Sequence, residues 1–472
     1  MQVLNQEAVD LVAALRSRDV SCEDVMRATL ERIAEVNGSI NALISLHDSE
    51  HLLEQARAAD VAGPKGALFG LPFAVKELES VAGMAHSEGS PIFKDRIAQK
   101  DSPMVHHLRE AGAIFIGKTN VPEFGLGSHS YNPVHGVTRN PYDTNVTAGG
   151  SSGGAAAALA TRMVALADGS DMMGSLRNPA AFCNVYGFRP SWGVIPRGPD
   201  GETFLQQLST NGPMARSPRD LALLMEVIAQ PDPRVPHNTP PQNWTLQAPE
   251  RLEGMRIGWL ADWGGAFPME AGVLSQCEAG LSAFAVLGAV VTPVAPPFSA
   301  EELWHSWTVL RHWAVANELG QYFKNPETCD LLKPAAIWEV EAGLSLDGQA
   351  IAKAGAIRSK WFATLANLFE TYDFLVLPSA QVWPFPADWD WPKEVAGHLM
   401  DTYHRWMEVV VPVSLAGVPC ISVPCGFGAA GLPMGMQVFA RKGDDLALLN
   451  AAQTYHAATH WPDIPPQHIQ HG

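Results

Sequence analysis

The chain has 472 residues, of which 47% are hydrophobic and 17% are charged, so it can bury a large core and is neither disordered nor fibrous. Its net charge of −17 disfavours nucleic acids and anionic membrane surfaces as partners, because both are bound through Lys and Arg. The length admits two or three domains, or one large α/β domain with insertions.

The cysteines and the N-terminal sequence bear on cofactors and compartment. No two of the six cysteines form a CxxC pair, and no His/Cys group has zinc spacing, so we expect reduced thiols and no metal. Residues 1–17 have an amphipathic helical pattern with acidic residues and no apolar signal-peptide core, so we expect a cytoplasmic protein. The uncharged stretches 281–300 and 409–440 are interrupted by Pro and Gly and are interpreted as core segments, not membrane spans.

Helix and strand patterns alternate through the first half of the chain. Ser21, followed by Asp24, is a candidate N-cap for one of the first helices. One strand ends in Lys76, which is unusual because lysine is almost never fully buried unless it is paired. The alternation predicts a mixed or mainly parallel sheet covered by helices. The spacing of apolar residues predicts helices over 6–36, 50–61 and 104–111, and strands over 68–77, 113–117 and 163–167.

The most distinctive segment is 148–160, a glycine- and serine-rich run followed by an apolar alanine helix. The glycines let the backbone turn and expose its amides, and the helix would place its N-terminus under the loop. A Gly/Ser run alone is typical of a flexible linker. A linker is not normally followed at once by a helix of core character, so we interpret 148–160 as an active-site loop. A second serine segment, 168–177, follows it.

The second half of the chain contains a proline-rich segment, 231–250, which we expect to be a surface linker. Residues 300–406 hold nine of the fourteen tryptophans, mostly on helical patterns. Most of these should pack in the core, but we expect the region to shape a substrate pocket, with the run 383–391 as a candidate wall. Further strands are expected over 255–260, 289–294, 374–378 and 421–424.

Two overlapping G-x-S-x-G matches within 149–154 bring the α/β-hydrolase nucleophile elbow into consideration. That fold needs an acid and then a histidine downstream, and neither His404 nor His456 has a convincing partner in the sequence. The chain has no phosphate-binding P-loop, no H-E-x-x-H and no dinucleotide fingerprint. The motifs therefore give no indication of a nucleotide or metal mechanism.

Three motifs together resemble the amidase signature family, the Ser–cis-Ser–Lys amidases. They are the strand-end lysine in Leu71-Pro72-Phe73-Ala74-Val75-Lys76, the loop Gly149-Gly150-Ser151-Ser152-Gly153-Gly154 and the segment Gly174-Ser175-Leu176-Arg177. Flanking matches at 117–120, 140–141, 179–181, 417–419 and 431–435 extend the resemblance over nearly the whole chain. The resemblance implies one amidase signature domain over 1–472, with a mixed, mostly parallel sheet, helices on both faces and a catalytic core at 65–200.

By this resemblance Ser175 is the nucleophile, Ser151 is the bridging serine behind a cis peptide after Gly150, and Lys76 is the base. The interval of 24 residues between the two serines is that of the family. A serine hydroxyl needs a neighbour to take its proton, and lysine can do so only if burial lowers its pKa toward neutrality. Ser151 would relay the proton, since a hydroxyl both donates and accepts. No cofactor is implied.

The remaining site residues are expected to support this triad. Backbone amides around Met172, Met173 and Gly174 would hold the oxyanion. Gly125 aligns with a loop position that lines the acyl pocket in some members of the family. Asp171 and Arg177 are expected to pair and brace the loop. Ser152 and Lys118 are rivals of Ser151 and Lys76, and the motif spacing and position favour the latter two.

One departure from the family pattern bears on the substrate. Met172 stands where Thr is frequent, and Met173 stands where the family commonly has Gly. Two flexible thioethers would make the site apolar, which favours a bulky apolar or aryl amide over a small polar one. The alternatives are a glutaminase-like subunit of a tRNA-dependent amidotransferase, an esterase or carbamate hydrolase with the same triad, and a scaffold protein without catalysis. A homodimer is compatible with the family.

Overall fold

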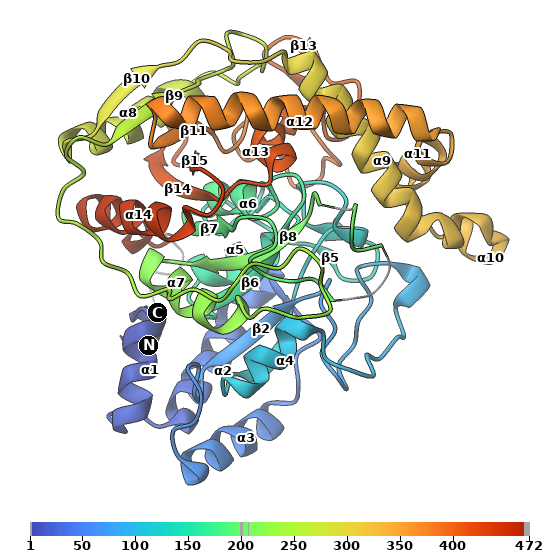
Figure 1. The fold of residues 1–472 in the computed structure, drawn as a ribbon. Coiled ribbons are helices and arrows are strands. Elements are labelled where there is room, and N and C mark those ends of the chain that lie inside the picture. The colour runs from blue at the N-terminus through green and yellow to red at the C-terminus, as the bar shows by residue number, and fades with distance from the viewer. Residues whose placement is uncertain (1, 199–201, 206, 467–472) are drawn as a thin grey trace.

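The computed structural model describes residues 2–198, 202–205 and 207–466 (Figure 1). The helices are α1 (Ala8–Ser17), α2 (Cys22–Ile40), α3 (Ser49–Ala62), α4 (Pro103–Glu110), α5 (Gly153–Ala160), α6 (Arg177–Phe182), α7 (Pro218–Ile228), α8 (Val273–Val286), α9 (Ala300–Lys324), α10 (Pro326–Cys329), α11 (Pro334–Leu344), α12 (Gly348–Thr371), α13 (Val411–Ala416) and α14 (Asp445–Thr459). The strands are β1 (Leu43–Ile44), β2 (Pro72–Lys76), β3 (Ile114–Thr119), β4 (Tyr131–Asn132), β5 (Gly136–Val137), β6 (Leu166–Asp171), β7 (Tyr186–Arg189), β8 (Thr210–Ala215), β9 (Arg256–Trp259), β10 (Val290–Pro293), β11 (Phe374–Pro378), β12 (Glu394–Val395), β13 (His398–Leu399), β14 (Cys420–Phe427) and β15 (Pro433–Phe439).

Eight strands form the central sheet, in the order β10-β9-β11-β15-β14-β7-β8-β6. β9 is parallel to its neighbours β10 and β11, and the other neighbouring pairs are antiparallel. The expected mixed α/β domain is confirmed, but the expectation of mostly parallel pairing is wrong. β6 and β7 are connected by α6 and run in the same direction, as parallel neighbours would. They do not pair with each other, because β8 lies between them and is antiparallel to both.

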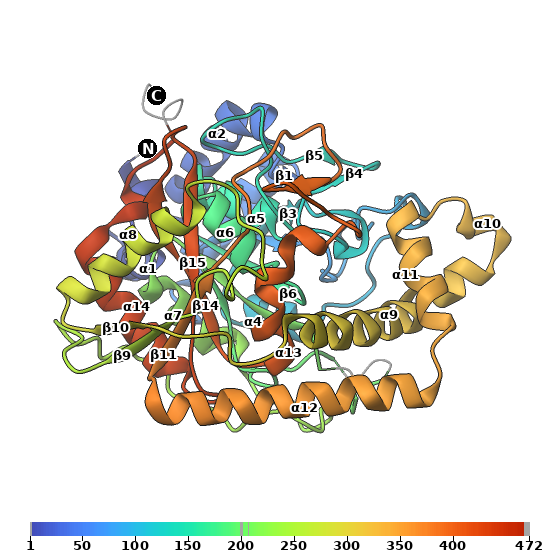
Figure 2. The ribbon, with the colours of Figure 1, turned by 90° about the horizontal axis from the view of Figure 1, so that it is seen from above.

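Helices cover both faces of this sheet (Figure 2). On β15, a Cβ on Gly435 would lie 2.9 Å from the Ala181 Cβ of α6, while the side chain of the next residue, Met436, reaches Gly280 of α8. Because alternate residues of a strand point to opposite faces, α6 and α8 pack on opposite sides of the sheet. A strand covered on both faces is expected to be apolar or buried throughout, and residues 420–426 of β14 are all buried.

A second, three-stranded sheet has the order β1-β3-β2, with β2 parallel to β3. β2 packs against β6, the edge strand of the central sheet. Lys76 is the last residue of β2. The small sheet therefore brings this lysine to the edge of the large one.

Most of the elements expected in the first half are present. Ser21 is the N-cap of α2, and its hydroxyl accepts a hydrogen bond from the Asp24 N–H at 3.0 Å. The strand expected over 163–167 is displaced, because β6 begins only at Leu166. Arg162 has a left-handed φ of 64°, so the chain is still turning there after α5, and pairing with β8 starts from Leu166.

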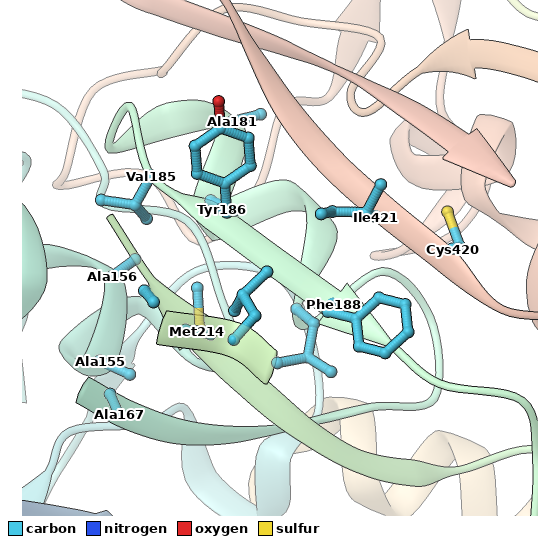
Figure 3. Close-up of a cluster of buried hydrophobic side chains, with 14 of the residues drawn as sticks. Ala155, Ala156, Ala167, Ala181, Val185, Tyr186, Phe188, Met214, Cys420 and Ile421 are labelled. Carbon is cyan, nitrogen blue, oxygen red and sulfur yellow. The ribbon is translucent and has the colours of Figure 1, made fainter. Parts of the chain in front are cut away.

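Helix α5 is entirely buried, as its alanine-rich sequence indicates. Its small side chains face a cluster formed with the neighbouring strands, in which Ala155 and Ala156 lie near Met214 and Phe188 (Figure 3). A Cβ on Gly154 would lie 2.3 Å from the Asn120 nitrogen, so glycine is required for this close approach. The loop before α5 is thus fixed in the core.

The second half of the chain adds a layer of long helices, in which α9 packs against both α11 and α12 (Figure 2). Trp307 and Trp361 are fully buried there. Trp383 packs against Gly272 and Gly428 and donates its indole N–H to the Ala271 carbonyl.

The segment 231–250 contains neither helix nor strand and is largely exposed. The stretches 281–300 and 409–440 form helices, strands and turns of the domain. No helix in the described ranges has the length and apolar character needed to cross a membrane.

Candidate active site

Lys76 lies at the centre of a cluster of serine oxygens. Its Nζ is 2.8 Å from Ser151 Oγ, 2.8 Å from Ser152 Oγ and 3.0 Å from Ser170 Oγ. The lysine side chain is completely buried. The sequence-predicted lysine and bridging serine are therefore in hydrogen-bond contact, and Ser152 shares that contact.

Ser170 is a member of this cluster that the sequence motifs do not single out. Its carbonyl oxygen is a further partner of the Lys76 Nζ at 3.3 Å, and Asp168 accepts a hydrogen bond from the Lys76 backbone N–H at 2.9 Å. Asp168 and Ser170 are two apart on β6, so they point to the same face of the strand. This alternation is the signal that could have identified both residues.

Burial lowers the pKa of Lys76 to about 7, against the opposing effect of the nearby Asp168, Asp171 and Glu79 carboxylates. Burial also raises the pKa of Asp168 to about 7. One carboxylate oxygen of Asp168, Oδ2, has no hydrogen-bond partner among the described residues. Each of the two charges opposes the effect of burial on the other group's pKa.

The loop before α5 holds Ser151 next to the second serine segment. The peptide bond between Gly150 and Ser151 is cis, as the resemblance implied. The Ser152 N–H donates to the Ser175 carbonyl at 3.3 Å, which joins the two segments through their backbones. Ser175 is 7% exposed, so solvent reaches it at the edge of an otherwise buried cluster.

Asp171 organises the segment that carries Ser175. Its carboxylate accepts hydrogen bonds from the Gly174 and Leu176 amides at 2.9 and 3.1 Å and from Arg177 Nε and Nη2 at 3.0 and 2.9 Å. Although burial alone would raise the pKa of Asp171, Arg177 and Arg189 hold it well below its usual range. Arg177 is fully buried, and its two bonds to Asp171 join the end of β6 to the start of α6.

The Gly174 N–H, one of the amides expected to hold the oxyanion, donates a hydrogen bond to Asp171 Oδ1 at 2.9 Å. Its φ of 80° turns the backbone so that the amide faces Asp171. Within the described residues, the amides of Met172, Met173 and Ser175 make no hydrogen bond to another protein group. Met172 is half-buried and Met173 is buried, so one of the two thioethers reaches the surface of the site.

Gly125 lies beside the catalytic candidates, in the short 3-10 turn Glu123–Gly125. A Cβ at this position would be 3.6 Å from Ser151 Oγ and 2.7 Å from Leu78 Cδ1. Its φ is 68°, in the region that favours glycine. Gly125 therefore lies beside Ser151, and its expected role in lining the acyl pocket stays a prediction.

The rival residues have other partners. Lys118 lies 3.5 Å from a carboxylate oxygen of Glu77, and both side chains are fully buried. His404 contacts Thr402, and His456 contacts the Tyr186 hydroxyl at 3.2 Å, so neither bonds to Ser151 or Ser175. The described ranges contain no group of three or more His, Cys, Asp or Glu side chains that could hold a metal ion.

The buried lysine at the end of β2 is thus hydrogen-bonded to two serines of the glycine-rich loop. The family model of Amidase matches residues 24–449. The chain therefore belongs to the amidase signature family, whose members are hydrolases that act on amides.

Several relatives match along nearly their whole length. An acylamidase of Rhodococcus erythropolis is 32% identical over 470 residues, covering 97% of this chain and 96% of the relative. A subunit of the glutamyl-tRNA(Gln) amidotransferase of Azotobacter vinelandii is 32% identical over 487 residues, covering 97% and 98%. The crystal structure of a bacterial aryl acylamidase of the amidase signature family superposes with a TM-score of 0.91, at 26% identity and 99% coverage of both chains.

Proposed function

We propose that this chain is an amidase that cleaves a bulky apolar or aryl amide through an acyl-enzyme on Ser175. The observation that carries the proposal is the Lys76 Nζ, which is buried, 2.8 Å from Ser151 Oγ and has a pKa lowered to about 7. A lysine that is neutral near physiological pH can accept a proton from a serine hydroxyl.

In the proposed cycle, Ser175 Oγ attacks the amide carbonyl carbon while its proton passes to Ser151 and the Ser151 proton passes to Lys76. The amides of Met172 and Met173 stabilise the oxyanion, since their N–H groups have no acceptor among the described protein groups. The lysine ammonium then returns a proton through Ser151 to the leaving amine, and the C–N bond breaks. Water hydrolyses the resulting ester, with the same two residues taking and returning its proton.

The preference for a bulky apolar or aryl amide is supported by two observations. Met172, three residues before Ser175, offers a half-buried thioether that adapts to large apolar groups. The structurally similar aryl acylamidase acts, by its name, on aryl amides, and the acylamidase relative acts, by its name, on acyl amides. A clear preference for acetamide or malonamate over anilides would contradict the proposal.

The first test is labelling of the purified chain with a fluorophosphonate probe, followed by mass spectrometry of the adduct. We expect one adduct on Ser175, lost in Lys76→Ala and retained in the control Lys94→Ala, which changes an exposed lysine. General base catalysis is worth about 10²–10⁴-fold, so labelling of Lys76→Ala should slow by at least that order. An adduct on Ser151, or none in folded protein, would refute the assignment.

A second candidate is a glutaminase-type subunit of a tRNA-dependent amidotransferase. The 32% identity to the amidotransferase subunit from Azotobacter vinelandii favours it. Glutaminase activity, or purification in complex with partner subunits, would support this candidate over a stand-alone amidase. Anilide hydrolysis by the isolated chain would support the first.

A further inference from the structure

A buried charged cluster lies beside the site, on helices α9 and α11. Arg311 Nε is 2.7 Å from Glu339 Oε1, and these side chains are 5% and 0% exposed. The Tyr403 hydroxyl is 2.7 Å from both Arg311 Nη2 and Glu339 Oε1. His312 Nδ1 lies 2.5 Å from the other carboxylate oxygen. Glu339 thus neutralises the charge of Arg311 within a closed set of hydrogen bonds.

One nitrogen of the Arg311 guanidinium contacts a residue outside this cluster. Arg311 Nη1 lies 3.2 Å from Met172 Sδ. A thioether is a weak acceptor, whereas an arginine N–H is a strong donor that is costly to bury without a good acceptor. The serine mechanism makes no use of Arg311.

This donor, Arg311 Nη1, lies close to the proposed catalytic serines. Met172 is three residues before Ser175, and both Met172 and Tyr403 are half-buried. A Cβ on Gly127 would lie 3.8 Å from the Tyr403 ring, as a Cβ on Gly125 would lie 3.6 Å from Ser151 Oγ. The short segment 125–127 therefore runs from the bridging serine to Tyr403, whose hydroxyl bonds Arg311.

We propose that Arg311 Nη1 is a specificity-determining donor that binds an uncharged oxygen acceptor, a second carbonyl or an ether, in the acyl part of the amide substrate. The substrate oxygen would replace Met172 Sδ as the acceptor. An uncharged acceptor is favoured because Glu339 already neutralises the positive charge of Arg311. A substrate carboxylate would therefore bring a buried negative charge that has no positive partner. This inference rests on the proposed amidase function and names a polar contact within an otherwise apolar substrate.

The test compares kcat/KM for two anilides of equal length, 3-methoxypropanoyl anilide and pentanoyl anilide, which differ by an ether oxygen in place of a methylene. Hydrogen bonds to charged groups are strong enough that we expect the wild type to favour the ether by about 10-fold or more. The ratio should fall to about 1 in Arg311→Gln combined with Glu339→Gln, which removes both charges together. Arg311→Lys should also lose the preference while retaining a cation for Glu339, so the test does not depend on the double variant folding.

The matched control is Arg251→Gln combined with Glu253→Gln, the same substitutions in an exposed pair at 2.9 Å. It should retain the wild-type ratio. Equal ratios in the wild type and both Arg311 variants, with Ser175 still labelled by fluorophosphonate, would overturn this inference alone. Preference for succinanilate, which carries a carboxylate, would overturn the uncharged acceptor. Failure of wild-type Ser175 to react would overturn the inference together with the proposed function.

Discussion

At the scale of single residues, the protonation of Lys76 governs the proposed chemistry. The amine accepts a proton only when it is neutral, and burial lowers its pKa to about 7. We therefore expect kcat/KM for an anilide to rise as the pH increases through about 7 and to level off above it. A pH–rate profile from about pH 5.5 to about pH 9 measures this, and a flat profile across pH 7 would contradict it.

A substitution at Asp168 tests whether the pH–rate profile reports Lys76, because it should shift the midpoint in a known direction. The Asp168 carboxylate raises the pKa of Lys76, opposing the effect of burial. Asp168→Asn removes that charge and keeps an oxygen that can accept the Lys76 N–H. The midpoint of the pH–rate profile should therefore move to lower pH. An unchanged midpoint, or one at higher pH, would show that the profile reports another group.

Gly125 tests how closely the loop surrounds Ser151. In Gly125→Ala, the left-handed φ of 68° opposes the added methyl group, which would lie 2.7 Å from Leu78 Cδ1 and in van der Waals contact, at 3.6 Å, with Ser151 Oγ. Gly83→Ala is the control, because its φ is 82° and its Cβ would meet nothing within 4 Å. Urea denaturation should show a loss of about 1–2 kcal/mol in Gly83→Ala and a larger loss in Gly125→Ala, because only the latter also displaces Leu78. Only Gly125→Ala should slow labelling of Ser175, and equal labelling in the two would contradict the placement.

The sequence predicts the residues that carry a motif and misses those that act through geometry. Lys76 can be found because a strand-end lysine is conspicuous in an apolar segment. Ser170 and Asp168 become significant only once β6 is known to lie beside β2, a contact between segments about 90 residues apart. The hydrogen bond from the Gly174 amide to Asp171 is missed for a related reason, since no local pattern gives the direction of that side chain.

At the scale of secondary-structure elements, the ion pair between Asp171 at the end of β6 and Arg177 at the start of α6 holds the segment of Ser175. Arg177→Met leaves a buried carboxylate with one of its two arginines, so we expect a loss of about 3–5 kcal/mol in unfolding free energy, measured in urea. The control Arg27→Met, which breaks an exposed pair with Glu23, should cost less than about 1 kcal/mol. Comparable losses in the two variants would contradict the bracing role.

The sequence predicts where helices and strands lie along the chain more reliably than it predicts which of them pack together. Apolar periodicity and the Ser21 cap are local signals, and α1, α2 and α3 lie where those signals place them. Strand pairing is non-local. The order of helices and strands along the chain could not reveal that β8 inserts between β6 and β7, or that an arginine on α9 reaches Met172.

At the scale of the whole molecule, the single α/β domain supplies the proposed base, bridging serine and nucleophile from one chain. The length of the sequence leaves the number of domains open. The structure brings the three-stranded sheet and the central sheet together at the contact of β2 with β6, where Lys76 bonds Ser170 of β6 and also Ser151 of the loop before α5. The catalytic candidates therefore lie within this chain, which bears directly on whether it works alone.

We expect the purified chain, without partner subunits, to hydrolyse an anilide with a kcat/KM at least about 100-fold above that for glutamine, because burying an aryl group against an apolar wall discriminates by this order. Chromatographic measurement of product release tests this. Light scattering defines the oligomeric state of the purified chain in the same assay. Added tRNA should not change either rate, since a net charge of −17 opposes binding of a polyanion. Two outcomes would instead place this chain with the amidotransferase subunits: glutamine hydrolysis that is faster than anilide hydrolysis, or glutamine hydrolysis that appears only after partner subunits are added. The reason is that a site built to bind one polar side chain rejects an apolar substrate.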